Sequence, residues 1–348
     1  MNSPVGGSQP FLLGSYTANG GPGLGLGQID LETGQPTVDH WNTEVEEPSW
    51  LTPAADGRTV YAVGELEPEG RISALRLDDD RRPVLLNSVT TGAKPAHLTV
   101  HPDGFALASL YDGGAVAVHP LAADGSIEPA SDVRVHTLSA GQTQAHAHQV
   151  VIAPSGSEIL AVDLGTDTVY TYRLDPVTGR LDESGRTRFT AGSGPRHLAF
   201  HPDGRHVYVV HELDSTVTVC GWADSVLTPG PVHSTLLDGP PTTAAPNHPS
   251  EIVVAADGRF VYAGNRGRNT VAVFATDDEG AKLHLTATPS CGGDWPRHLS
   301  IDRTGRWLYA ANERSGDVVW FPLDPVSGVP GPAAGRLPVP AVTQFDPS

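Results

Sequence analysis

The chain has 348 residues, a formal net charge of −18 and a sequence pI near 5.1. This acidic balance argues against nucleic acid as a partner, because such a surface needs positive charge to displace counterions. No apolar segment approaches the length of a membrane span, so we also expect no membrane partner.

The start of the chain and its two cysteines indicate no special compartment. The segment 1–11, MNSPVGGSQPF, lacks the basic and apolar parts of a signal peptide, which leads us to expect a cytoplasmic protein. Cys220 and Cys291 match neither a metal-binding spacing nor a disulfide framework.

Three strand-like segments open the chain, at residues 11–20, 24–34 and 36–42. After them, a unit of two apolar strands joined by a Gly-centred turn occurs six times. The copies span residues 48–65, 95–112, 148–165, 195–212, 249–266 and 296–313. Successive turn glycines lie 47, 52, 48, 54 and 47 residues apart, which is enough chain for a four-stranded antiparallel blade.

The fourth copy illustrates how each blade is expected to fold. Strand A covers residues 196–200, a turn covers 202–204 and strand B covers 206–211. A polar loop at 212–215 leads into strand C at 216–221, and a more variable strand D follows. Asp-Gly turns suit such hairpins, because Gly accepts a positive φ and Asp tolerates the neighbouring position.

The two ends of the chain are expected to share one blade. The opening segments match strands B, C and D, while residues 339–345 supply the missing strand A. We therefore predict an all-β, single-domain, seven-bladed propeller over residues 1–348, with strand A innermost. Six blades come from about 48–338, and the seventh combines 11–42 with 339–345. Pairing the two ends removes the exposed sheet edges of an open array.

The D–A junctions and the B–C loops of such blades lie on one face, where function is expected. Four polar residues from three successive blades reach this face near the axis. We interpret His148 as a base or acid, Glu212 as a carboxylate, and Arg196 and Arg266 as guanidinium donors, together forming a catalytic group. A structural role in the channel is the alternative for each residue.

Five further residues are weaker candidates for substrate binding: His146, His197, Arg297, His298 and Glu313. His197 and His298 occupy the same repeat position, which is typical of an architectural role. His146 and His148 have the alternate spacing of a metal-ligand pair, but no third ligand is evident, so we expect no metal.

Several motifs resemble the lactonase-type propeller family: HAH at 146–148, GPRHLAFHPDG at 194–204, HELDSTV at 211–217, PSEIVVAADGRFVYAGNRG at 249–267 and PRHLSIDRTGRWLYAANE at 296–313. That family contains bacterial propeller-type 6-phosphogluconolactonases and fungal 3-carboxy-cis,cis-muconate lactonizing enzymes. The resemblance implies action on lactones without a cofactor. It also places the catalytic residues proposed for the muconate branch on His148, Arg196, Glu212 and Arg266.

The function expected from these observations is hydrolysis of an anionic sugar lactone such as 6-phosphogluconolactone. Two alternatives stay open: a lactonizing cycloisomerase or other ring-modifying enzyme acting on a carboxylate or specialised metabolite, and a non-catalytic binding scaffold. Gly64, Leu110 and His211 stand where the family commonly has Asn at the end of strand B, so the exact substrate stays open. The oligomeric state stays open as well.

Overall fold

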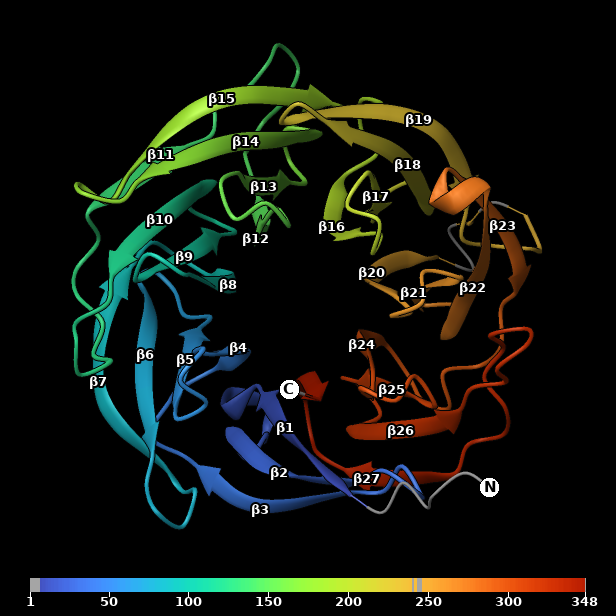
Figure 1. Ribbon diagram of the computed structural model, residues 1–348, viewed down its shortest axis with the longest axis horizontal. Coiled ribbons are helices and arrows are strands. Elements are labelled where there is room, and N and C mark those ends of the chain that lie inside the picture. The colour runs from blue at the N-terminus through green and yellow to red at the C-terminus, as the bar shows by residue number, and fades with distance from the viewer. Residues whose placement is uncertain (1–6, 240, 243–245, 348) are drawn as a thin grey trace.

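The computed structural model describes residues 7–239, 241–242 and 246–347. Within them the chain forms seven four-stranded antiparallel sheets around a central axis (Figure 1), which confirms the predicted seven-bladed propeller. Residues 1–6, on which the expectation about a leader segment partly rests, lie outside the described residues. No helix in the described ranges combines the length and the apolar character that crossing a bilayer requires.

Each blade runs from an inner strand A to an outer strand D (Figure 1). The A strands are β4 (Pro48–Pro53), β8 (Pro95–His101), β12 (Ala147–Ile152), β16 (Pro195–Phe200), β20 (His248–Val254), β24 (Pro296–Ile301) and β28 (Val342–Pro347). The B strands are β5 (Thr59–Gly64), β9 (Phe105–Leu110), β13 (Ile159–Asp163), β17 (His206–His211), β21 (Phe260–Arg266), β25 (Trp307–Asn312) and β1 (Ser8–Ser15).

The outer half of the disc consists of the C and D strands. The C strands are β6 (Gly70–Leu77), β10 (Ala115–Pro120), β14 (Thr168–Asp175), β18 (Thr216–Ala223), β22 (Thr270–Asp277), β26 (Asp317–Pro322) and β2 (Leu24–Asp30). The D strands are β7 (Pro83–Thr91), β11 (Asp132–Val135), β15 (Arg180–Arg188), β19 (Val226–Ser234), β23 (Lys282–Ala287), β27 (Gly335–Pro338) and β3 (Pro36–Asn42). In the described part of the chain, two short 3-10 helices, η1 (Thr17–Asn19) and η2 (Asp278–Gly280), lie between strands.

The apolar pattern of each strand follows from its depth in the blade. Strands such as β5 and β9 are buried at every position, because both faces contact neighbouring blades, and they read as continuous apolar runs. Outer strands such as β11 and β27 alternate between partly buried and exposed residues, as expected when one face meets solvent.

Among the described residues, seven hydrophobic clusters hold the disc together, and each lies between two adjacent blades. One cluster, for example, packs Phe11 and Ile29 of the closing blade against Tyr309 and Val318 of the last blade. Apolar burial is therefore completed between blades, so that no blade has a core of its own.

The ring closes where β1 pairs antiparallel with β28, with Leu13 opposite Phe345. The final strand begins at Val342, later than the predicted 339, because β27 continues to Pro338 and Ala341 turns the chain with φ 50°. A left-handed residue also precedes the A strand in four other blades, at Glu47, Lys94, Gly194 and Trp295. This conformation is therefore a recurring part of the D–A junction.

A belt of hydrogen bonds between side chains and backbone links each blade to the next, between inner strands except at Ser109, which lies in the B strand β9. Around the ring, these contacts join Gln344 to Leu51, Thr52 to Leu98, Ser109 to His148, Gln149 to Leu198, Arg196 to Ser250, Ser250 to Pro296, and Ser300 to Phe345. Since backbone ladders run only within a blade, these side chains set the register of one blade against the next.

We predict that Gln344→Ala destabilises the ring at its closure. The Gln344 side chain accepts from the Leu51 N–H at 2.6 Å and donates to the Leu51 carbonyl at 3.1 Å, and the residue is buried. Leaving these backbone groups without partners should lower the free energy of unfolding by about 1–3 kcal/mol, measured by urea denaturation. Gln35→Ala, at an exposed position, is the control. An unchanged midpoint for Gln344→Ala would contradict the prediction.

Candidate active site

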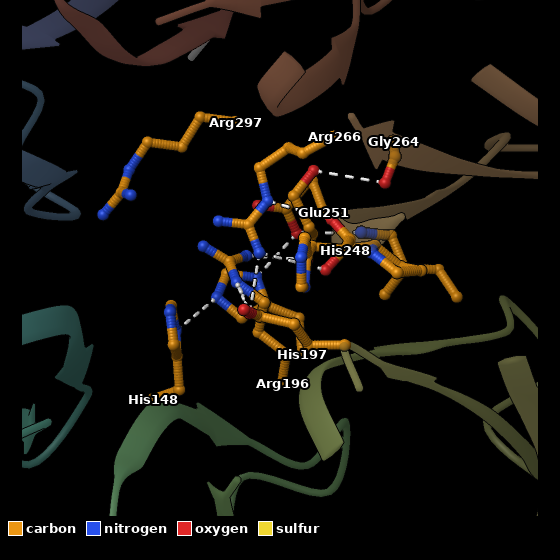
Figure 2. A network of polar contacts seen from close by, with 12 residues as sticks. His148, Arg196, His197, His248, Glu251, Gly264, Arg266 and Arg297 are labelled. Atoms are coloured by element: carbon orange, nitrogen blue, oxygen red, sulfur yellow. Dashed lines mark hydrogen bonds and ion pairs between the residues drawn. The ribbon is translucent and has the colours of Figure 1, made fainter. Parts of the chain in front are cut away.

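The mouth of the propeller is the rim where D–A junctions and B–C loops meet. His148, Arg196 and Arg297 come from the beginnings of β12, β16 and β24. Glu212 directly follows β17, and Arg266 is the last residue of β21. Figure 2 shows the Arg196 and Arg266 side chains close together, with Arg297 apart from them. The structure thus gathers the four residues predicted to be catalytic at one mouth.

Glu212 lies between two guanidinium groups. Its Oε2 is 3.3 Å from Nε of Arg196 and 2.7 Å from Nη2 of Arg266. Burial alone would raise the pKa of Glu212, but the charges of Arg266 and Arg196 outweigh it and lower that pKa. Burial, together with Arg266, lowers the pKa of Arg196 to about 9, while the Glu212 charge opposes this shift. One carboxylate therefore lies between two guanidinium cations, which leaves an excess of positive charge on this side of the mouth.

Backbone carbonyls fix the direction of both guanidiniums. Arg196 donates from Nη1 to the Ser250 carbonyl at 2.6 Å, and Arg266 donates from Nε to the His248 carbonyl at 3.0 Å. The Arg266 guanidinium also lies 5.5 Å from the centre of the Trp295 ring, within cation–π range. These contacts hold the two cations before any ligand binds.

His148 is mostly buried and is an uncharged base at neutral pH. Burial, followed by the charge of Arg196, lowers the pKa of His148 well below its usual value. Its Nδ1 lies 3.1 Å from Nε2 of His197. Its other nitrogen, Nε2, has no hydrogen-bond partner among the described residues and is not one of their fully buried unpaired atoms. Nε2 is therefore the nitrogen available at the mouth.

A second charged group surrounds Arg297. Nη2 of Arg297 donates to the Tyr16 hydroxyl at 2.6 Å and lies 3.4 Å from Oε2 of Glu65, while Nη1 lies 3.4 Å from Oε2 of Glu313. Burial alone would lower the pKa of Arg297, but Tyr16 and Glu65 outweigh it and raise that pKa. Here two carboxylates serve one guanidinium, so this side of the mouth has an excess of negative charge.

Beneath the mouth lies an inner layer of Trp50, His97, His197, Glu251 and His298, which share one position in the repeat. The rings of Trp50 and His97 are tilted by 33° with centres 4.1 Å apart, and Trp50 meets His298 edge-on at 5.3 Å. Glu251 Oε1 is 2.8 Å from Nδ1 of His197, and its Oε2 is 3.6 Å from Nε2 of His298. Burial raises the pKa of Glu251 and lowers the pKa of His298 to about 4.

The residues predicted to bind substrate fall in three places. Arg297 and Glu313 lie at the mouth, whereas His197 and His298 lie in the inner layer. His146 stacks on Tyr111 with ring centres 4.3 Å apart, and its Nδ1 lies 3.2 Å from the Tyr111 carbonyl.

Sequence reasoning missed Tyr16, Glu65 and Glu251. Repeat alignment contained a signal for two of them. Glu65 occupies the same position as Glu212 and Glu313, and Glu251 occupies the same position as His197.

The space at the site is narrow. A cavity of about 10 Å³, roughly the room of one water molecule, is lined by side chains that include His148, Arg196, Glu251 and Arg297. Larger cavities lie beside the A–B turns at the opposite face, next to Gly57 and Gly305, and beside the B–C loop of the third blade, next to Thr166. None of these cavities is lined by His148, Arg196, Glu212 or Arg266.

One group of possible metal ligands occurs in the described part of the chain, at His201, Asp203 and His206 on the opposite face. Hydrogen bonds within the turn account for its geometry. Asp203 accepts from Nδ1 of His206 at 2.8 Å, and Nδ1 of His201 accepts the Asp203 N–H at 3.3 Å. These three side chains therefore stabilise the A–B turn.

Comparison with known proteins places the chain in a family. Residues 10–346 match the family model described as lactonase, 7-bladed beta-propeller. The 6-phosphogluconolactonase of Bacillus subtilis is 30% identical over 347 residues, covering 96% of this chain and 97% of that protein.

Solved structures agree in fold over almost the whole chain. A Bacteroides fragilis protein described provisionally as a 6-phosphogluconolactonase has a TM-score of 0.90 and 29% identity, covering 99% of both chains. The periplasmic gluconolactonase of Pseudomonas aeruginosa has a TM-score of 0.87 and 28% identity, covering 97% of this chain and 98% of that one. The chain therefore belongs to the lactonase family of seven-bladed β-propellers, and it is a lactonase in this general sense.

Proposed function

We propose that the protein hydrolyses an anionic sugar lactone, with 6-phosphogluconolactone as the first candidate. The observation that carries this proposal is the Glu212 carboxylate shared by two guanidiniums beside an uncharged His148. The similarity to the Bacillus subtilis 6-phosphogluconolactonase supports the choice of substrate class.

The uneven charge of the mouth suggests how the substrate lies. Arg196 and Arg266 have one carboxylate between them, so an anionic group is favoured on their side, through charge-assisted hydrogen bonds. Arg297 faces Glu65 and Glu313, which favour sugar hydroxyl groups as donors. Because the cavity between His148, Arg196 and Arg297 is so small, the substrate lies over the mouth rather than between these side chains.

The proposed reaction is addition of water to the lactone carbonyl. Nε2 of His148 takes a proton from the water as its oxygen forms a bond to the carbonyl carbon. The guanidinium of Arg196 stabilises the oxyanion of the tetrahedral intermediate. When the ring C–O bond breaks, the departing alkoxide takes the proton from His148, and the product is the hydroxy acid.

His148→Gln should abolish most of the activity. Loss of a general base typically costs about 10²–10⁴-fold in rate, so kcat for 6-phosphogluconolactone hydrolysis should fall within that range. His284→Gln, on an exposed outer strand, is the control and should behave as wild type. Full activity in a folded His148→Gln variant would refute the proposed function.

Arg266→Gln should weaken the selection for anionic lactones. Hydrogen bonds to charged groups contribute about 1.5–3 kcal/mol, so kcat/KM for 6-phosphogluconolactone should fall about 10–150-fold. For the neutral gluconolactone the loss should be several times smaller. Arg259→Gln, at an exposed position on the opposite face, is the matched control. Equal losses for the two lactones would contradict an anion site at Arg266.

The pH profile should reflect the lowered pKa of His148. A histidine acts as a base only when unprotonated, so the active form is fully present above its folded-state pKa and is lost as the pH falls through it. Because that pKa lies well below 6.5, kcat/KM should stay level near neutral pH and decline only in more acidic solution. Steady-state rates across an acid-to-neutral buffer series test this, and a midpoint at or above 6.5 would contradict it.

A further inference from the structure

A continuous line of polar contacts leads from the mouth into the buried inner layer. Nδ1 of His148 lies 3.1 Å from Nε2 of His197, and Nδ1 of His197 lies 2.8 Å from Oε1 of Glu251 (Figure 2). The three residues come from β12, β16 and β20. Each ring of the line therefore uses one nitrogen toward the mouth and the other toward Glu251.

This geometry addresses a difficulty in the proposed chemistry. A base that takes a proton at His148 would become an imidazolium, which burial opposes first and the charge of Arg196 next, although Glu212 partly offsets that charge. Like charges in such a setting strongly disfavour one another. A proton that stayed on His148 would thus be held at a high cost in free energy.

We infer that Glu251 is the proton acceptor of the site, and that it acts through His197 as a relay behind His148. This inference rests on the proposed role of His148 as the base. Neither His197 nor Glu251 touches the substrate in this assignment, so both are positioning and relay residues. They also hold the His148 ring with Nε2 toward the mouth.

The relay is balanced in protons. As Nε2 of His148 takes a proton from water, the proton on its Nδ1 passes to Nε2 of His197, and the proton on Nδ1 of His197 passes to Oε1 of Glu251. Both imidazoles end neutral and Glu251 ends as a carboxylic acid. When the alkoxide leaves, it takes the proton from Nε2 of His148, and the other two protons return along the same path.

The surroundings of Glu251 suit a group that gains and loses a proton. The residue is 4% exposed, and its Oε2 is buried without a hydrogen bond in the described structure. A carboxylate with one unsatisfied oxygen is costly to bury, which favours proton uptake. The nearby charge of Arg196 and the ring of His298, 3.6 Å away, oppose this and keep the ionised form accessible. Burial, followed by the charge of Glu251, raises the pKa of Asp346 to about 6.

The first test uses the unmodified protein. Single-turnover hydrolysis of 6-phosphogluconolactone is measured in mixtures of H₂O and D₂O. A relay moves three protons together, so the rate should depend on the deuterium fraction along a bowed curve. A straight line, which indicates one proton in flight, or no isotope effect would overturn the relay.

The second test replaces the acceptor. Glu251→Gln preserves the size of the side chain and can still accept from Nδ1 of His197, but it cannot store a proton. The rate should fall about tenfold or more, as part of the ~10²–10⁴-fold effect of acid–base catalysis, and the curve should become straight. Ser300→Ala, which removes a buried belt contact in β24, is the control and should keep the bowed curve.

The outcomes separate the two proposals. If His148→Gln is inactive while Glu251→Gln keeps the wild-type rate and curve, the relay is wrong and the proposed function stands. If His148→Gln remains active, the proposed function itself fails, and the relay fails with it.

Discussion

The pairing of β1 with β28 is the constraint on which the rest of the structure depends. Because the seven hydrophobic clusters lie between blades, each blade has two faces that only its neighbours can cover. An open array would leave two such faces and two sheet edges in water. Closing the ring removes both, and the belt of contacts between inner strands then fixes how far each blade is turned against the next.

The arrangement of charges at the mouth is a consequence of that closure. Burying a guanidinium or a carboxylate is unfavourable unless an opposite charge lies nearby, and here three of each lie around the mouth. Their numbers balance, but their distribution does not: one side holds Glu212 with two cations and the other holds Arg297 with two anions. The mouth as a whole is neutral but has a positive side and a negative side, which suits a substrate with one anionic end.

The repeat and the ring could be read from the sequence because turn glycines and apolar runs report on local structure. The grouping of His148, Arg196, Glu212 and Arg266 followed from topology alone, since every B–C loop opens on the same face. The line from His148 through His197 to Glu251 could not be predicted in this way. Repeat position places a residue on a strand, but which ring nitrogen meets which oxygen depends on side-chain rotamers and on the twist between blades.

Arg196 belongs to two systems at once, because one nitrogen of its guanidinium joins neighbouring blades through Ser250 while another faces Glu212. Selection for architecture and selection for chemistry therefore act on a single side chain. A substitution of Arg196 that changes the charge of the site would therefore also remove the hydrogen bond between the fourth and fifth repeats. New substrate specificities should arise instead at positions of the mouth whose side chains make no contact between blades.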